Sequence, residues 1–291
     1  MRIFNDPMKH PVLIGLTLSV TLVACLYALA LRSAPSTDDT DAELTLYCAA
    51  GLQQPISQIT QAYTENTGRA VNIIYNGSGA LLSQIKLGNG DLYLPANSAY
   101  IDDAQESQLI TKCIPVALLT AIIAVHKDNR DIQSLEDLTK PGIRISFADE
   151  TAAIGRFARA QLIEHGVYAA IEKNIIVTKP TVSNIIEDVA LGSADATIAW
   201  RALASNHPQL RIIEVPLFTQ APQTTAIAIL KKSDHPTAAR DLANYISNTD
   251  VAREILQNYG IELPELPNSA VADQKKIKFN MLSKPGNKQS N

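Results

Sequence analysis

The 291-residue chain has few of the residues that build metal centres and nucleophilic active sites. Its 3 cysteines and 5 histidines show no Cys-x-x-Cys or other metal-ligand spacing, which argues against a structural or catalytic metal and predicts no cofactor. No Ser/His/Asp or Cys/His arrangement is recognisable, so catalysis is the least favoured function. Outside the N-terminal region only Cys48 and Cys113 remain, and two cysteines leave open whether a disulfide forms.

The chain also lacks an excess of positive charge. Its net charge is −4, and no basic patch with interleaved aromatic residues occurs, which argues against nucleic-acid binding. Hydrophobic residues make up 46% and charged residues 19% of the chain, as in ordinary globular proteins. The length therefore predicts one large domain or two smaller ones.

The N-terminal region predicts export. Arg2 and Lys9 precede an uncharged run over residues 12–31 that is long enough to cross a bilayer, with the N-terminus inside. A lipobox-like stretch ends at Cys25, and Ala28-Leu29-Ala30 is similar to a signal-peptidase site, so a lipoprotein and a cleaved, secreted form are alternatives. The apolar run continues past both, which favours an uncleaved anchor on the outer side of a bacterial inner membrane. Residues 1–40 are thus predicted to be an anchor or signal segment with a tether.

The remainder alternates strand and helix patterns, which predicts an α/β fold. Gly68 stands where a glycine would end a helix, and Thr151 and Thr181 are expected to cap the helices that follow them. The apolar run over residues 116–125 is too long for one ordinary strand, and we interpret it as a strand followed by a crossing into a second lobe. The expected boundaries are 41–117 plus 225–267 for the first lobe and 118–224 for the second. Residues 268–291 are polar and lysine-bearing, and they predict a disordered tail.

A glycine-flanked serine is the most informative local pattern. The run Val71–Ile74 predicts a buried strand, Gly77-Ser78-Gly79 follows, and a helix pattern begins directly after it. A helix N-terminus with unpaired N–H groups and a serine hydroxyl suits an anion. The alternative is an ordinary turn in which Ser78 only caps the helix. A second small-residue turn, at Gly51, follows the preceding strand, and both turns can converge at the carboxyl edge of an open sheet.

These pieces together resemble the molybdate/tungstate-type substrate-binding proteins of ABC importers, over residues 44–260. The resemblance rests on the following stretches: Leu46-Tyr47-Cys48-Ala49-Ala50-Gly51-Leu52, Gly77-Ser78-Gly79-Ala80-Leu81-Leu82-Ser83-Gln84-Ile85, Asp91-Leu92-Tyr93-Leu94, Gly192-Ser193-Ala194-Asp195-Ala196 with Trp200, and Tyr259-Gly260. It implies a two-lobed type II periplasmic-binding-protein fold with a double hinge crossing, which closes on a tetrahedral oxyanion.

The resemblance also assigns ligand contacts. Ser78 matches the serine of the second turn, whereas Gly51 stands where the first turn usually carries another serine. Backbone donors are expected near Ile154 and Val182, and Trp200 stands in the place of the usual tyrosine with an indole N–H as donor. Each position has a simpler interpretation: Gly51 as a turn residue and Ile154, Val182 and Trp200 as core. Arg201, which follows Trp200, either adds charge to the site or forms a salt bridge.

The sequence therefore predicts an extracytoplasmic, monomeric binding protein that hands an oxyanion to an ABC permease. The alternative is a tethered sensor or accessory module of the same fold with another small ligand. An enzyme using Cys48 or Ser78 is the third hypothesis. The sequence leaves open which oxyanion binds among molybdate, tungstate and sulfate.

Overall fold

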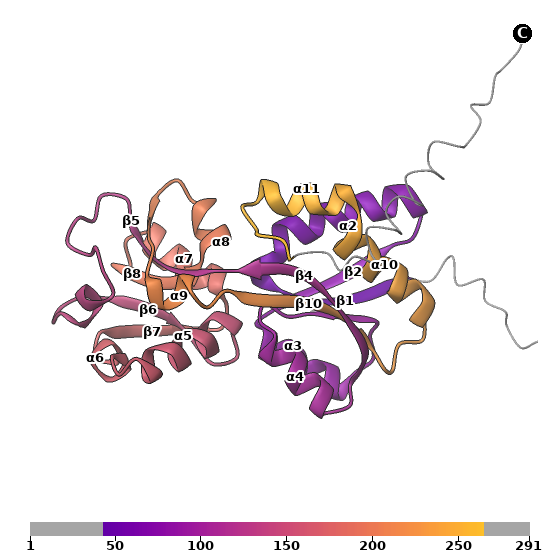
Figure 1. Ribbon diagram of the computed structural model, residues 1–291, viewed down its shortest axis with the longest axis horizontal. Coiled ribbons are helices and arrows are strands. Elements are labelled where there is room, and N and C mark those ends of the chain that lie inside the picture. The colour runs from indigo at the N-terminus through magenta and orange to yellow at the C-terminus, as the bar shows by residue number, and fades with distance from the viewer. Residues whose placement is uncertain (1–42, 265–291) are drawn as a thin grey trace, which may run out of the picture. The chain divides into compact units, whose positions relative to one another are not determined.

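The computed structural model describes residues 43–264, which form two five-stranded mixed sheets flanked by helices. Figure 1 shows β4 and β10 running from one sheet toward the other. The expected α/β fold with two lobes is thereby confirmed. The predicted anchor, tether and polar tail lie outside the described residues, and no described helix is long and apolar enough to cross a membrane.

The first lobe is built on the sheet with strand order β2-β1-β3-β10-β4. β1 pairs in parallel with β2 and β3, while β10 is antiparallel to β3 and β4. Its elements are β1 (Leu44–Ala49), η1 (Ala50–Leu52), α2 (Gln53–Thr67), β2 (Val71–Asn76), α3 (Ser78–Leu87), β3 (Leu92–Leu94), α4 (Ala99–Glu106), β4 (Ile110–Leu119), β10 (Gln223–Leu230), α10 (Pro236–Asn248) and α11 (Asp250–Asn258).

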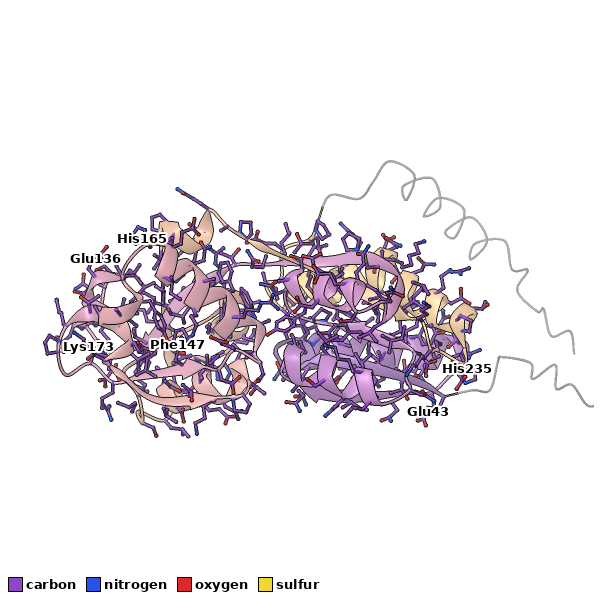
Figure 2. All side chains as sticks on the ribbon, turned by 90° about the horizontal axis from the view of Figure 1, so that it is seen from below. Glu43, Glu136, Phe147, His165, Lys173 and His235 are labelled. Carbon is purple, nitrogen blue, oxygen red and sulfur yellow. The ribbon has the colours of Figure 1, made fainter. Side chains whose placement is uncertain are left out.

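The second lobe is built on the sheet with strand order β7-β6-β8-β5-β9, in which β6 is parallel to β7 and β8 and β5 is antiparallel to β8 and β9. Its elements are β5 (Ala121–His126), η2 (Glu136–Thr139), β6 (Ile145–Ala148), α5 (Ala153–Glu164), α6 (Tyr168–Glu172), β7 (Ile175–Lys179), α7 (Val182–Ala190), β8 (Ala196–Trp200), α8 (Arg201–Ser205), β9 (Leu210–Ile213) and α9 (Pro216–Thr219). Figure 2 shows Phe147 inside this lobe, and Glu136, His165 and Lys173 at its outer side.

The chain crosses between the two sheets twice. The long apolar run divides at Thr120 into β4 and β5, and β10 carries the chain back. Leu118 and Leu119 still pair with β10 in the first sheet, so that sheet extends two residues beyond the expected boundary at residue 117. A third segment approaches the crossing, since the N–H of Leu118 donates to the carbonyl of Glu262 over 2.8 Å.

The helix stop predicted at Gly68 is confirmed. Gly68 adopts a φ of +76° directly after α2, as a glycine helix stop requires. The strand predicted at residues 71–74 is confirmed as β2, but the expectation that it is buried was wrong, because β2 is the edge strand of its sheet and its residues are half-buried or exposed. The short helices α6, α8 and α9 were not predicted, since 4 or 5 residues are too few to show a helical period.

Candidate functional site

A small cavity lies between the two lobes, at the ends of their strands. Its volume is about 20 Å³, enough for one or two water-sized groups. All five ligand-binding candidates from the sequence line it. The lining residues are Ala49, Ala50, Gly51, Asn76, Gly77, Ser78, Ala96, Ala152, Ala153, Ile154, Thr181, Val182 and Trp200. The structure thus brings together residues that lie far apart in the sequence, such as Gly51 and Trp200, which are separated by 149 positions.

Two hydrogen bonds hold Ser78 in place, and neither of them uses its hydroxyl hydrogen. It is 1% exposed, its Oγ accepts a hydrogen bond from the N–H of Ala96 over 3.1 Å, and its carbonyl accepts one from the Tyr93 hydroxyl over 2.8 Å. The N-cap of α3 is Gly77, so the interpretation of Ser78 as a capping residue was wrong. Because a hydroxyl has one hydrogen in addition to its acceptor sites, Ser78 can still donate to a ligand.

Three helices, α3, α5 and α7, begin at the cavity. The first turn of a helix contains N–H groups without intrahelical acceptors, and the positive end of the helix dipole lies there. Thr181 caps α7 as expected, since its Oγ1 accepts from the N–H of Asn184. The expected cap at Thr151 was wrong: the N-cap of α5 is Ala152, without a side-chain bond, and Thr151 Oγ1 instead donates to Asp149 over 2.6 Å.

The side chains of Ile154 and Val182 are buried, with exposures of 1% and 5%, so they pack in the core as the simpler interpretation expected. Their backbones nevertheless belong to the first turns of α5 and α7 at the cavity. Ile154 and Val182 therefore fit both predictions, because their side chains pack in the core while their backbones lie at the cavity.

Trp200 provides a buried donor without an acceptor. It is fully buried at the end of β8, and its indole Nε1 has no hydrogen-bond partner. The ring packs against Phe157 with ring centres 5.8 Å apart. Buried donors are normally paired because leaving one unpaired costs about 1–3 kcal/mol. Trp200 is thus core and cavity wall at once.

Direct contacts tie the lobes together on the α4–α5 side of the cavity. The N–H of Gly79 donates to the carbonyl of Thr151 over 2.7 Å, and the Tyr100 hydroxyl donates to the carbonyl of Glu150 over 2.5 Å. Arg156 of α5 pairs with Asp103 of α4, and its guanidinium lies 4.9 Å from the ring centre of Tyr100. The lobes are therefore in contact around the cavity.

A larger cavity of about 310 Å³ lies beside the first, on the side of α2, α7 and α8. Ala50 and Gly51 line both. Its wall is rich in polar side chains, which include Gln53, Gln54, Ser183, Glu187, Asn206 and His207.

The small cavity is electrically neutral apart from backbone dipoles. None of the described residues that line it has an ionisable side chain. Arg201 does not line it either, because its guanidinium pairs with Glu214 and Glu262 at 3.1 and 3.3 Å. The salt-bridge interpretation of Arg201 is thereby confirmed.

Two buried groups near the cavity, the Tyr93 hydroxyl and the Cys48 thiol, are held in their neutral forms. Burial raises the pKa of the Tyr93 hydroxyl and of the fully buried Cys48 thiol. A thiol with a raised pKa is a poor nucleophile at neutral pH. Cys48 and Cys113 are both free, which answers the question of their pairing.

Sequence reasoning missed the residues that support the site. Tyr93 and Ala96 hold Ser78, and Tyr100 bridges the lobes. The pattern around residues 91–94 marked only a strand, and a hydroxyl that reaches 15 positions along the chain has no local signature. Only the fold shows these roles.

Comparisons with known proteins agree with this architecture. The family model of bacterial extracellular solute-binding proteins matches residues 44–262. The molybdate-binding protein ModA of Mycobacterium tuberculosis is 26% identical over 227 residues, which cover 76% of this chain and 85% of that protein.

Solved structures show the same fold with different ligands in their titles. The Azotobacter vinelandii periplasmic molybdate-binding protein aligns with a TM-score of 0.64 at 16% identity, over 76% of this chain and 100% of that one. Iron-bound HitA of Pseudomonas aeruginosa aligns with a TM-score of 0.61 at 17% identity, over 82% and 99% of the two chains. The fold alone therefore does not select the ligand. The matched family model, which spans most of the chain, shows that this protein belongs to the bacterial extracellular solute-binding proteins.

Proposed function

We propose that this protein captures a tetrahedral oxyanion of the molybdate, tungstate or sulfate type outside the cytoplasm and delivers it to an ABC permease. The observation that carries the proposal is the buried Trp200 N–H, which has no acceptor and belongs to a cavity where three helices begin. An oxyanion would accept from this N–H, from the Ser78 hydroxyl and from first-turn backbone N–H groups. The relative named as molybdate-binding supports the same ligand class.

The donors suit an anion better than a cation. Among the described residues of the cavity wall there is no carboxylate, imidazole or phenol that would ligate iron, and no group of three potential metal ligands occurs in residues 43–264. An oxyanion needs no counter-charge where enough dipoles converge on it. Binding without chemistry is the function that these neutral groups support.

A tetrahedral oxyanion is larger than the one or two water-sized groups that the small cavity holds, so capture as well as delivery requires the lobes to separate and close. The crossing at Thr120 and the return into β10 are the segments where rotation can occur, and the contacts of Tyr100 and Gly79 would break and re-form. We further propose that the chain acts as a monomer. We also propose that residues 12–31 keep it at the outer side of the inner membrane, with a lipid on Cys25 or cleavage as the alternatives.

The test is a panel of oxyanions on the full-length chain, by calorimetry and thermal shift. At a hundred times its dissociation constant, the correct ligand should stabilise the protein by about 2.7 kcal/mol. Ser78→Ala should weaken binding about ten- to a hundredfold, because it removes a donor to a charged ligand. Ser83→Ala is the matched control, since the Ser83 hydroxyl lies in the same helix and bonds the Gly79 carbonyl. A panel without any response would refute the proposal.

A second candidate is a sensor or accessory module with a larger ligand. The 310 Å³ cavity beside Gly51 favours it, because a substituent on the anion would find polar partners there. Adding small phosphate esters to the same panel separates the two candidates. Tighter binding of an ester than of every inorganic oxyanion would select this second function.

A further inference from the structure

Arg201 contacts one of the two crossings between the lobes and pairs with one acidic residue in each lobe. It directly follows Trp200, but its side chain turns away from the small cavity. Its backbone N–H donates to the carbonyl of Thr120 over 2.8 Å. Its guanidinium bridges Glu214 at 3.1 Å and Glu262 at 3.3 Å. One residue next to the proposed ligand contact thus reaches three separate segments.

Only one of these three segments is a crossing between the lobes. Thr120 lies between β4 and β5, where the chain enters the second lobe. Glu214 lies between β9 and α9, within the second lobe. Glu262 belongs to the first lobe, because its carbonyl accepts from Leu118 of β4 and the two residues form a β-bridge. The ion pair of Arg201 with Glu262 therefore joins the second lobe to the first.

The ion pairs of Arg201 contribute little to the stability of the fold. The side chain of Arg201 is 29% exposed, and those of Glu214 and Glu262 are 61% and 51% exposed, so each ion pair is partly screened by water. The Arg201 Nε is buried without a hydrogen-bond partner, which is unfavourable. The planar guanidinium instead holds the two carboxylates in a fixed geometry.

We propose that Arg201 is a positioning residue for ligand capture. Through its ion pair with Glu262, Arg201 fixes the end of β8 relative to the first lobe, sets the orientation of the second lobe and holds Trp200 against the first-lobe turns. This inference rests on the proposed function only in that it takes Trp200 as a ligand contact. The lobe orientation itself can be measured without a ligand.

The test uses the full-length chain with Arg201→Met, Arg201→Lys and Glu262→Gln. Trp200 is the only tryptophan of the sequence and is fully buried, so acrylamide quenching of its fluorescence reports opening of the lobes. The second readout is the dissociation constant of an oxyanion that the unmodified protein binds. Arg144→Met is the matched control, because Arg144 pairs with Asp195 over 2.7 Å entirely within the second lobe.

We expect Arg201→Met to weaken binding about three- to tenfold and to raise quenching of the unliganded protein. Glu262→Gln should shift both readouts in the same direction. Arg201→Lys should be intermediate, because an ammonium group keeps the charge but cannot bridge both carboxylates in a fixed geometry. Arg144→Met should leave both readouts unchanged.

The proposal is overturned if folded Arg201→Met and Glu262→Gln proteins keep both the affinity and the quenching of the unmodified chain. It is also overturned if Arg144→Met changes them equally. If Arg201→Met does not fold, the half-exposed Glu262→Gln decides the matter. If the unmodified protein binds no oxyanion, the proposed function fails, and the quenching of the unliganded variants alone decides whether Arg201 positions the lobes.

Discussion

Gly51 of the first lobe packs so closely against Val182 of the second that a Cβ atom on Gly51 would lie 2.9 Å from Val182 Cγ1. The same Cβ would lie 3.5 Å from Leu203 Cδ2 and 3.7 Å from Trp200 Cδ1. A serine at position 51, which the family resemblance leads one to expect, does not fit this arrangement of the lobes. The missing hydroxyl is therefore sterically linked to Val182, whereas the distance to Trp200 is that of an ordinary van der Waals contact.

Gly51→Ser should weaken oxyanion binding about tenfold or more, because overpacking by even a few atoms costs about 1–3 kcal/mol. Calorimetry measures the change. The double variant Gly51→Ser with Val182→Ala should regain most of the lost affinity, since the smaller side chain frees the space at Cγ1. Weakening that persists in the double variant would mean that the close contact is not the cause.

Replacing the indole N–H of Trp200 by a sulfur atom, which cannot donate a hydrogen bond, should reduce the affinity for the oxyanion without unfolding the protein. Because Trp200 is the only tryptophan, growth on the benzothiophene analogue of tryptophan changes this residue alone. Loss of a hydrogen bond to a charged ligand should weaken binding about ten- to a hundredfold. The melting temperature without ligand should stay the same or rise, because Nε1 has no partner in the unliganded structure. Unchanged affinity would remove Trp200 from the donor set.

How well the sequence predicts a structural feature depends on how far apart in the chain the interacting residues lie. The glycine after α2 and the threonine cap of α7 act over a few residues, and local patterns placed both correctly. The cap at Ser78 was wrong because a tertiary partner, the N–H of Ala96, engages its hydroxyl, and a local rule has no access to such a partner. The cap at Thr151 was wrong because its hydroxyl bonds a nearby side chain, Asp149, instead of the helix backbone.

The cavity itself followed from the order of motifs along the chain, through the family resemblance. Gly51, Ser78 and Trp200 meet there as expected. The exposure of β2 was missed because a β-branched run does not show whether a strand lies at a sheet edge. The bridges of Tyr100 and Arg201 between lobes were also missed, since they depend on how the lobes pack.

Tyr100→Phe should accelerate ligand release. The Tyr100 hydroxyl donates to the Glu150 carbonyl across the lobes, so its removal destabilises the closed form by about 1 kcal/mol, or roughly fivefold in affinity. Stopped-flow fluorescence of Trp200 should show the change mainly in the dissociation rate. Tyr47→Phe is the control, because its hydroxyl bonds the Asn89 carbonyl within the first lobe over 3.0 Å. Equal effects from both variants would contradict a role specific to lobe contact.

Binding of sulfate should be independent of pH between about pH 6 and pH 9, because no described residue that lines the cavity titrates there. Burial raises the pKa of Tyr93, Tyr100 and Cys48, so these neighbours stay neutral in this range. A raised folded-state pKa adds stability below the unfolded-state pKa, and this stability is lost only as the pH rises into the alkaline range. Phosphate is the positive control, since its own ionisation changes within the window. A sloping sulfate profile from calorimetry would mean that a titrating side chain of the protein contacts the ligand, which is incompatible with a site made of neutral donors.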